Sequence, residues 1–426
     1  MCYYLHSRMS LFYCLICILL GLHAKISGGL PSRSEGKVTT CHLPQQNDTL
    51  YKMSSINADF AFNLYRKFAM ETPDQNIFFS PVSISVALAM LSIGARSSTQ
   101  TQILEVLGFN LTDTSIEEIQ QDFQELICSL NFPKKELELQ MGNTLFIGKQ
   151  LKPLSKFLDA VKTLYETEVI STDFMNVSAA QEVINSQVEK QTKGKIVNLI
   201  QELKMNTIMV MVNYIHFKAQ WTNPFHPSKT EDSSSFLVDK MFTVKVPMMH
   251  QVEQFHYLVD TELNCTVLQM DYNKNALALF VLPKKGDMEG LESTMSSKTL
   301  KKWNNLLQKG WVNVFVPKFS ISATYDLRIM LVKMGIEDAF ADNADFSGLT
   351  EDSGVNLSYA AHKVVLSIGE KGTDDVTVSE VKFPDQSEST LLHPIIRFDR
   401  TFLFMILEKN TRSVLFLGKV VDPTEV

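Results

Sequence analysis

The residues of this 426-residue chain that could perform chemistry are nine histidines, six cysteines and scattered acidic side chains. None of them falls into a catalytic spacing: there is no Gly-x-Ser-x-Gly turn, no His-Glu-x-x-His pair, no glycine-rich phosphate loop and no calcium loop. His216 and His362 lie in or before strand-like runs, where a histidine is more often a hydrogen-bonded structural residue than a ligand. We therefore expect no catalytic residue, no metal site and no cofactor, and a protein that is not an enzyme.

The charge of the chain argues against a nucleic-acid partner. Its formal net charge is −7, and its 40 lysines and arginines are spread along the sequence. Binding to a phosphate backbone needs clustered positive charge. Nucleic acid is therefore not expected as a partner.

The N-terminus has the order of a secretory signal. His6 and Arg8 precede the apolar run 11–20, and small residues follow over 24–29. The run is shorter than the roughly 20 apolar residues that span a bilayer. We expect residues 1–28 to be a cleaved signal peptide and the mature chain to be secreted and extracellular, with no membrane attachment.

Five sites match the N-glycosylation pattern Asn-x-Ser/Thr, which fits an exported chain. They are Asn47, Asn110, Asn176, Asn264 and Asn356.

The cysteines leave their pairing open. Cys2, Cys14 and Cys17 depart with the signal, so that Cys41, Cys128 and Cys265 remain. An odd number allows at most one internal bridge, and a chain of this length can rely on its core for stability.

The elements that would position any site are helical first and mainly β-rich later. Residues 29–53 are polar and predict a flexible lead-in. An amphipathic helix is expected over 54–68, and a buried helix begins at Ser80-Pro81. A further helix is expected over 297–307, and strands over 207–217, 276–282, 312–316, 402–407 and 414–418, the last two forming a hairpin around 408–413. This order favours an α+β fold.

One polar stretch, 369–390, interrupts these elements between strand-like runs at 363–366 and 394–396. A loop of about 20 residues within a compact domain is uncommon, and such loops are usually functional or mobile.

A series of motifs then identifies a family. In order and spacing, the chain resembles the serpins through NIFFSPVSIS (76–85), TKGKI (192–196), NYIHFKAQW (213–221), PMM (247–249), PKF (317–319), ADFSGL (344–349), HKVVL (362–366), FDRTF (398–402) and FLGKV (416–420). The resemblance implies one domain over 54–426, with three β-sheets, about nine helices and the stretch 369–390 as an exposed reactive-centre loop.

The hinge of that loop argues against protease inhibition. Inhibitory serpins insert the cleaved loop into the main sheet, behind a hinge of small residues. Here Gly372 and Thr373 are followed by Asp375, whose carboxylate would enter the sheet on the same face as Thr373. Burying an unpaired carboxylate costs several kcal/mol. We expect a non-inhibitory member whose loop proteases can cleave; a serine protease inhibitor is the alternative.

Within the family, the resemblance is strongest to the members that carry thyroid hormone in blood plasma. It is carried by LYKMSSINADF (50–60), NFPKKELELQ (131–140), TEDSSSF (230–236), LNCTVLQMDY (263–272) and MSSKTLKKWN (295–304). It implies a monomeric plasma carrier of thyroxine and related iodothyronines. The carriers of steroid hormones are the nearest alternative.

The same resemblance implies the residues of a hormone pocket. The apolar slot and the polar groups that fix the ligand would come from Ser54, Gln269, Leu277, Leu300, Lys301, Asn304, Leu407, Lys409 and Arg412. Lys409 stands where the family pattern has an arginine, and lysine lacks the planar surface that stacks on a ring.

Overall fold

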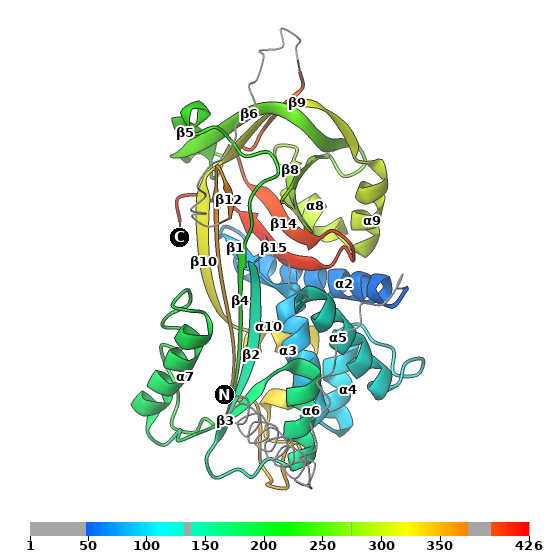
Figure 1. The fold of residues 1–426 in the computed structure, drawn as a ribbon, viewed down its shortest axis with the longest axis vertical. Coiled ribbons are helices and arrows are strands. Elements are labelled where there is room, and N and C mark those ends of the chain that lie inside the picture. The colour runs from blue at the N-terminus through cyan, green and yellow to red at the C-terminus, as the bar shows by residue number, and fades with distance from the viewer. Residues whose placement is uncertain (1–47, 132–137, 274, 374–392, 426) are drawn as a thin grey trace, which may run out of the picture. The chain divides into compact units, whose positions relative to one another are not determined.

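The fold belongs to residues Cys41–Val426, which form one compact unit of the chain. The computed structural model describes residues 48–131, 138–273, 275–373 and 393–425. Figure 1 shows the order of the elements along the chain.

Nine α-helices lie in the described residues: α2 (Asp48–Glu71), α3 (Pro81–Gly94), α4 (Ser97–Val106), α5 (Ile116–Asn131), α6 (Ser155–Tyr165), α7 (Val177–Gln191), α8 (Met288–Thr294), α9 (Ser297–Leu306) and α10 (Arg328–Met334). Two short 3-10 helices are η1 (Pro227–Lys229) and η2 (Asp338–Phe340).

The strands of the first sheet, in its order, are β1 (Ile77–Phe79), β15 (Val414–Val420), β14 (Phe402–Glu408), β8 (Ala276–Pro283), β7 (Cys265–Asp271), β6 (Thr243–Asp260), β9 (Gln308–Pro317) and β13 (Ile395–Arg397), with β5 (Glu231–Leu237) on β6. The strands of the second are β10 (Phe319–Asp326), β11 (Tyr359–Gly369), β4 (Met209–Lys218), β2 (Glu138–Gly148) and β3 (Glu168–Thr172), with β12 (Gly372–Thr373) on β11.

Strand pairing therefore gives two sheets in the described residues, where the family resemblance implied three. The reason is β6, a single strand of 18 residues. Its earlier residues pair with β5 and β9, and its last residues pair with β7. The continuous strand joins what would otherwise be two smaller sheets.

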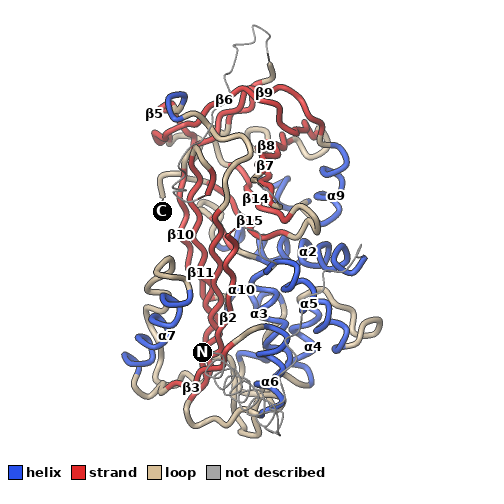
Figure 2. Tube along the Cα trace, viewed as in Figure 1, coloured by secondary structure: helices blue, strands red, loops and turns tan. Residues whose placement is uncertain are grey.

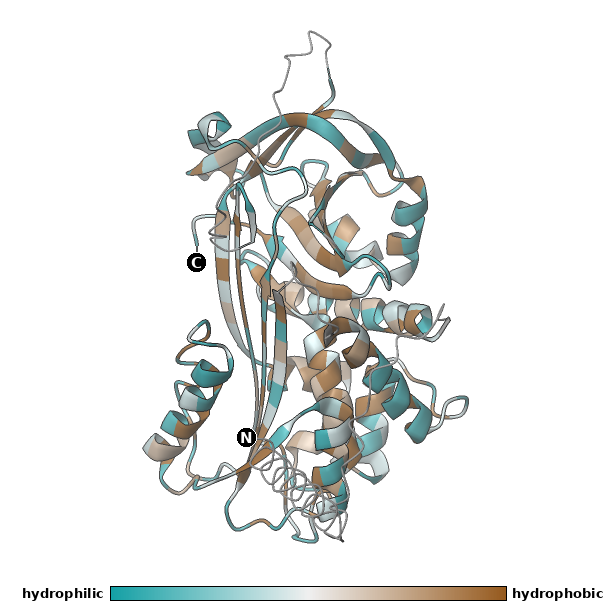
Figure 3. Cartoon of the chain, viewed as in Figure 1, coloured by the Kyte–Doolittle hydropathy of each residue, from teal (hydrophilic) through white to brown (hydrophobic). Residues whose placement is uncertain are grey.

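The helix α3 forms the centre of the core, as its uniformly apolar sequence predicts. Ser80 caps it by accepting a hydrogen bond from the backbone N–H of Ser83, and Pro81 occupies its first turn. The helix contacts α2, β4 and β15, and thirteen of its fourteen residues are buried. The tube in Figure 2 shows α3 to α6 on one side of the second sheet and α7 on the other, and Figure 3 shows apolar residues concentrated in α3, β14 and β15.

The first helix begins earlier than expected. The sequence predicts a flexible lead-in that ends at residue 53, but α2 already begins at Asp48. The side chain of Met53 is fully buried in the core, so packing stabilises this extra turn. Among the described residues, no helix combines the length and apolarity needed to cross a membrane.

Candidate ligand-binding site

The floor of the candidate site is a row of residues across three neighbouring strands. Leu277 on β8 pairs with Leu407 on β14 on one side and with Asp271 on β7 on the other. Leu277 and Leu407 are buried. Gln269, two residues before Asp271 and thus on the same face of β7, donates a hydrogen bond of 3.1 Å to the Asp271 carboxylate. The apolar side chains of Leu277 and Leu407 therefore lie next to the polar side chains of Gln269 and Asp271 along this row.

A tight hairpin turn brings the two cationic residues to the edge of this row. Buried Glu408 accepts hydrogen bonds from the backbone N–H and the hydroxyl of Thr411, at 2.6 and 2.9 Å. Arg412 follows with φ of 60°, in the left-handed region that residues other than glycine rarely adopt. Its N–H bonds the Glu408 carbonyl at 2.9 Å. Such strained positions concentrate at functional sites.

The two cations differ in their partners. Lys409 Nζ lies 3.2 Å from an oxygen of Asp271 and 3.5 Å from the carbonyl oxygen of Tyr272. The half-buried guanidinium of Arg412 forms no hydrogen bond or ion pair with any described residue. Burial lowers its pKa, against the opposing effects of Asp271, Tyr51 and Glu408. Arg412 is thus the cation left available to a ligand.

The helix α9 presents the second group of predicted residues. Leu300 and Asn304 are one turn apart, and Lys301 lies beside them. Leu300 is half-buried, whereas Lys301 and Asn304 are exposed and form no side-chain hydrogen bond with any described residue. Both polar groups are free to bond a ligand.

The buried side of α9 fixes the rotation of the helix. Fully buried Trp303 donates a hydrogen bond of 2.9 Å from Nε1 to Asp260 on β6, and Lys302 Nζ lies 2.9 Å from the same carboxylate. Burial alone would raise the pKa of Asp260, but the hydrogen bonds from Lys302 and Trp303 outweigh it and hold that pKa below its usual value. The anchoring leaves Lys301 and Asn304 on other faces of α9, whereas Leu300 lies one turn before Trp303 on the same side of the helix.

The helix α2 supplies Ser54 and is tied to α9. Ser297, the first residue of α9, donates hydrogen bonds from its N–H and its hydroxyl to Asp59, at 2.8 and 2.9 Å. Ser54 is buried, and α2 contacts both α9 and β15. Three residues earlier on α2, Tyr51 is 59% exposed. The predicted residues thus come from α2, α9 and the strand floor, which surround one region.

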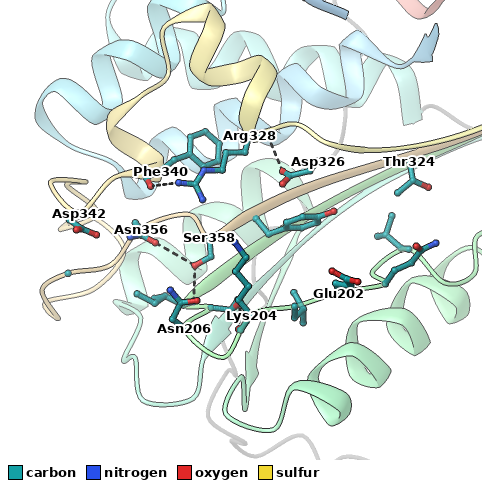
Figure 4. A pocket seen from close by; sticks show the side chains of 17 residues that line it. Glu202, Lys204, Asn206, Thr324, Asp326, Arg328, Phe340, Asp342, Asn356 and Ser358 are labelled. Carbon is teal, nitrogen blue, oxygen red and sulfur yellow. Dashed lines mark hydrogen bonds between the residues drawn. The ribbon is translucent and has the colours of Figure 1, made fainter. Parts of the chain in front are cut away.

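Sequence reasoning missed Asp271 and Tyr51. Both had a signal: Asp271 lies two residues after Gln269 on one strand, and Tyr51 lies one helical turn before Ser54. The described part of the chain shows no hydrogen bond between the three α9 residues and the hairpin cations. A separate cavity of about 870 Å³, seen in Figure 4, includes none of the nine predicted residues.

The loop hinge enters the second sheet at Thr373. This side chain is fully buried, its N–H bonds the carbonyl of Ala219 at 2.8 Å, and its hydroxyl accepts from the Ala219 N–H at 2.7 Å. Gly372 has φ of 142°, and a Cβ there would lie 2.0 Å from the Ala219 carbonyl oxygen, so the position requires glycine. Asp375 lies outside the described residues.

The hinge is close to the candidate site. Two residues after Ala219, Trp221 bonds the carbonyl of Gly369 through Nε1 at 3.0 Å and stacks on Tyr272, with ring centroids 4.1 Å apart. Tyr272 follows Asp271 and offers its carbonyl to Lys409. A short chain of contacts therefore connects the hinge with the hairpin cations.

Three further predictions can be compared with the structure. His362 is a hydrogen-bonded core residue, as expected: Nε2 accepts from the Ser80 N–H at 3.1 Å, Nδ1 lies 2.6 Å from Asn213 Oδ1, and burial lowers the pKa to about 3. Cys265 is free and buried, and Cys128 is disulfide-bonded; Cys41 lies outside the described residues. Asn110, Asn176 and Asn264 are exposed and Asn356 is half-buried, whereas Asn47 is not among the described residues.

Comparison with protein families and known proteins gives concordant results. Residues 55–423 match the family "Serpin (serine protease inhibitor)". The chain is 75% identical to thyroxine-binding globulin of Ovis aries over 418 residues, which are 98% of this chain and all of the relative. It is 73% identical to thyroxine-binding globulin of Homo sapiens over 417 residues, again 98% of this chain and all of the relative.

Solved structures of thyroxine-binding globulin also resemble this chain. A complex of thyroxine-binding globulin with thyroxine is 74% identical and matches with a TM-score of 0.83, over 88% of this chain and all of that chain. Human thyroxine-binding globulin with a cleaved reactive loop is 78% identical and matches with a TM-score of 0.74, over 76% of this chain and 96% of that chain.

Proposed function

The chain belongs to the serpin family, and we propose that it is a non-inhibitory carrier that binds thyroxine and related iodothyronines and catalyses no reaction. The observation that carries the proposal is the likeness to a solved thyroxine complex over the whole of that chain, at 74% identity. The presence of a signal-like N-terminus supports secretion into blood plasma.

The residues of the candidate site suit such a ligand. Thyroxine is a bulky iodinated diphenyl ether with an amino-acid tail, which needs an apolar slot and a few polar groups. In this proposal Leu277, Leu300 and Leu407 contact the rings. Lys301 and Asn304, which are exposed and unbonded, hold the tail, and Ser54 and Gln269 complete the wall.

The cations take a different role. Lys409 is held by Asp271, and Arg412 is half-buried without a partner among the described residues. In this proposal one of these cations lies over a ring face of the hormone, where a cation–π contact contributes about 0.5 to 2 kcal/mol. The unpartnered Arg412 is the better candidate because it would break no ion pair.

Equilibrium dialysis with radiolabelled thyroxine tests the proposal on the purified, full-length secreted protein. We expect saturable binding at one site, displaced by unlabelled thyroxine and not by cortisol. Displacement by cortisol alone would favour the steroid carrier. Incubation with serine proteases provides a second test, because an inhibitor forms a complex that survives boiling in detergent, and we expect only loop cleavage.

A further inference from the structure

A cavity of about 870 Å³ lies at one end of the second sheet, and none of the predicted hormone-site residues lines it. Its walls are the segment 199–208 before β4, the end of β10 with the start of α10, and the segment before β11 (Figure 4). The volume is in the range of sites that hold small molecules, about 300–1,000 Å³. Nothing in the proposed carrier function uses this space.

An N-glycosylation sequence forms part of the wall. Asn356 and Ser358, the acceptor and the hydroxyl residue of the pattern, both line the cavity. The Ser358 hydroxyl donates to Asn356 Oδ1 at 3.5 Å and accepts from the backbone N–H of Ile208 at 2.9 Å. Asn356 Nδ2, the atom that carries a glycan, bonds no described residue and is not shut off from solvent.

The other described sequons lack this setting. Asn110, Asn176 and Asn264 are exposed, and none of them lines the cavity. Asn110 Nδ2 donates to Asp113 at 2.7 Å, and Asn176 caps α7 through its Oδ1. A glycan on any of these three would extend directly into solvent.

The groups around the cavity suit a sugar. Figure 4 shows Lys204, Asn206 and Arg328 placed around the space together with Phe340. The side chains of Lys204 and Asn206 form no hydrogen bond or ion pair with a described residue. Such donors and acceptors bond sugar hydroxyl and acetamido groups.

We propose that Asn356 is glycosylated and that its first N-acetylglucosamine occupies this cavity. During secretion, Nδ2 of Asn356 attacks the anomeric carbon of a lipid-diphosphate-linked oligosaccharide. A C–N bond forms, the sugar–phosphate bond breaks, the lipid diphosphate leaves, and Nδ2 gives up one proton to solvent. Transfer takes place on the unfolded chain, so the half-buried position of Asn356 in the folded protein does not prevent it.

The sugar would brace two adjacent parallel strands at their first residues. Ile208 leads directly into β4, and Ser358 leads directly into β11. Besides the Ile208 bond, the N–H of Ser358 bonds the Met209 carbonyl at 2.9 Å. A group filling the cavity therefore restrains the segment 199–208 against the start of β11, independently of hormone binding.

The test combines peptide mass spectrometry with hydrogen exchange on the secreted full-length protein. We expect a glycan on the peptide that contains Asn356, retained in Ser358→Thr and lost in Asn356→Gln. We further expect amide exchange within 199–208 to be about five-fold faster in Asn356→Gln, through more frequent local opening. Asn264→Gln, which removes an exposed sequon, is the matched control and should leave this segment unchanged.

An endoglycosidase that leaves one N-acetylglucosamine separates the first sugar from the rest of the glycan. Protection of 199–208 should persist after this trimming. An unmodified Asn356 would overturn the proposal outright. If Asn356 is modified but amide exchange in 199–208 is equal in all variants, the glycan lies outside the cavity and does not restrain this segment. If the protection of 199–208 is lost on trimming, the first sugar is not the occupant of the cavity.

Discussion

Lys409 Nζ lies 3.2 Å from Oδ1 of Asp271, although 138 residues separate the two in sequence. The strand β8 lies between β7, which contains Asp271, and β14, which Lys409 directly follows. The pairing holds the lysine beside the apolar row of Leu277 and Leu407 while Arg412 stays unpaired. Both side chains of the pair are about 30% exposed, so the ion pair itself contributes little to stability. Its effect is to position a cation at the candidate site.

The first prediction concerns this position. We expect Lys409→Arg to strengthen thyroxine binding by about 0.5 to 1 kcal/mol, because a guanidinium can bond Asp271 and still offer a planar face to a ring. Equilibrium dialysis measures the change, with the exposed Lys309→Arg as a control. Weaker binding by Lys409→Arg would show that the position does not act through stacking.

The second prediction concerns α9. Asn304→Ala should weaken thyroxine binding by about 1 to 2 kcal/mol, the loss of one hydrogen bond to a charged group. Its neighbour Asn305 is also exposed and lies on another face of the helix, so Asn305→Ala should bind normally. Equal affinity in both folded variants would remove Asn304 from the site.

The third prediction concerns the loop. Buried Thr373 already occupies the sheet, and a nick between residues 375 and 391 should let the loop enter further. Because Trp221 and Tyr272 connect the hinge with Lys409, we expect nicking to raise the melting temperature and lower thyroxine affinity together.

Asp375→Ala should enlarge both changes, since no carboxylate would then have to leave water. Melting temperature and hormone dissociation are to be measured on the same nicked sample. Unchanged affinity would exclude the coupling, even with a higher melting temperature.

The fourth prediction is a pH dependence at Asp122 on α5. This side chain is 7% exposed, and its Oδ2 has no hydrogen-bond partner. Burial raises its pKa, the charges of Glu118 and Glu125 raise it further, and that of Lys52 lowers it. The folded protein thus binds this proton more tightly than the unfolded chain, and stability is lost as the pH rises from the unfolded value through the raised pKa.

Asp122→Asn should therefore increase the free energy of unfolding at pH 7, because the neutral amide removes the cost of keeping an ionised carboxylate in a buried position. The difference from the parent chain should vanish below about pH 4. Denaturant unfolding at several pH values measures it, and Glu117→Gln, an exposed acid on the same helix whose charge is not among those acting on Asp122, serves as the control. A constant difference across this range would show that Asp122 does not titrate as proposed.

Local pattern was enough to predict much of this protein. The helix beginning at Ser80-Pro81, the hairpin around 408–413 and the helix 297–307 were confirmed, because capping residues, apolar periodicity and turn residues act over a few positions. The predicted family was confirmed, since its motifs recur in order along the chain. The roles of the nine site residues remain predictions.

Tertiary structure alone decided which side chains meet. Whether Lys409 or Arg412 is paired depends on Asp271, which reaches the hairpin only because β7, β8 and β14 align in one register. Two of the expected sheets are joined because β6 is one continuous strand. The extra turn of α2 forms because Met53 packs into the core. Sequence periodicity specifies which face of an element is apolar, but the partner across a sheet or between helices is set by packing of distant segments.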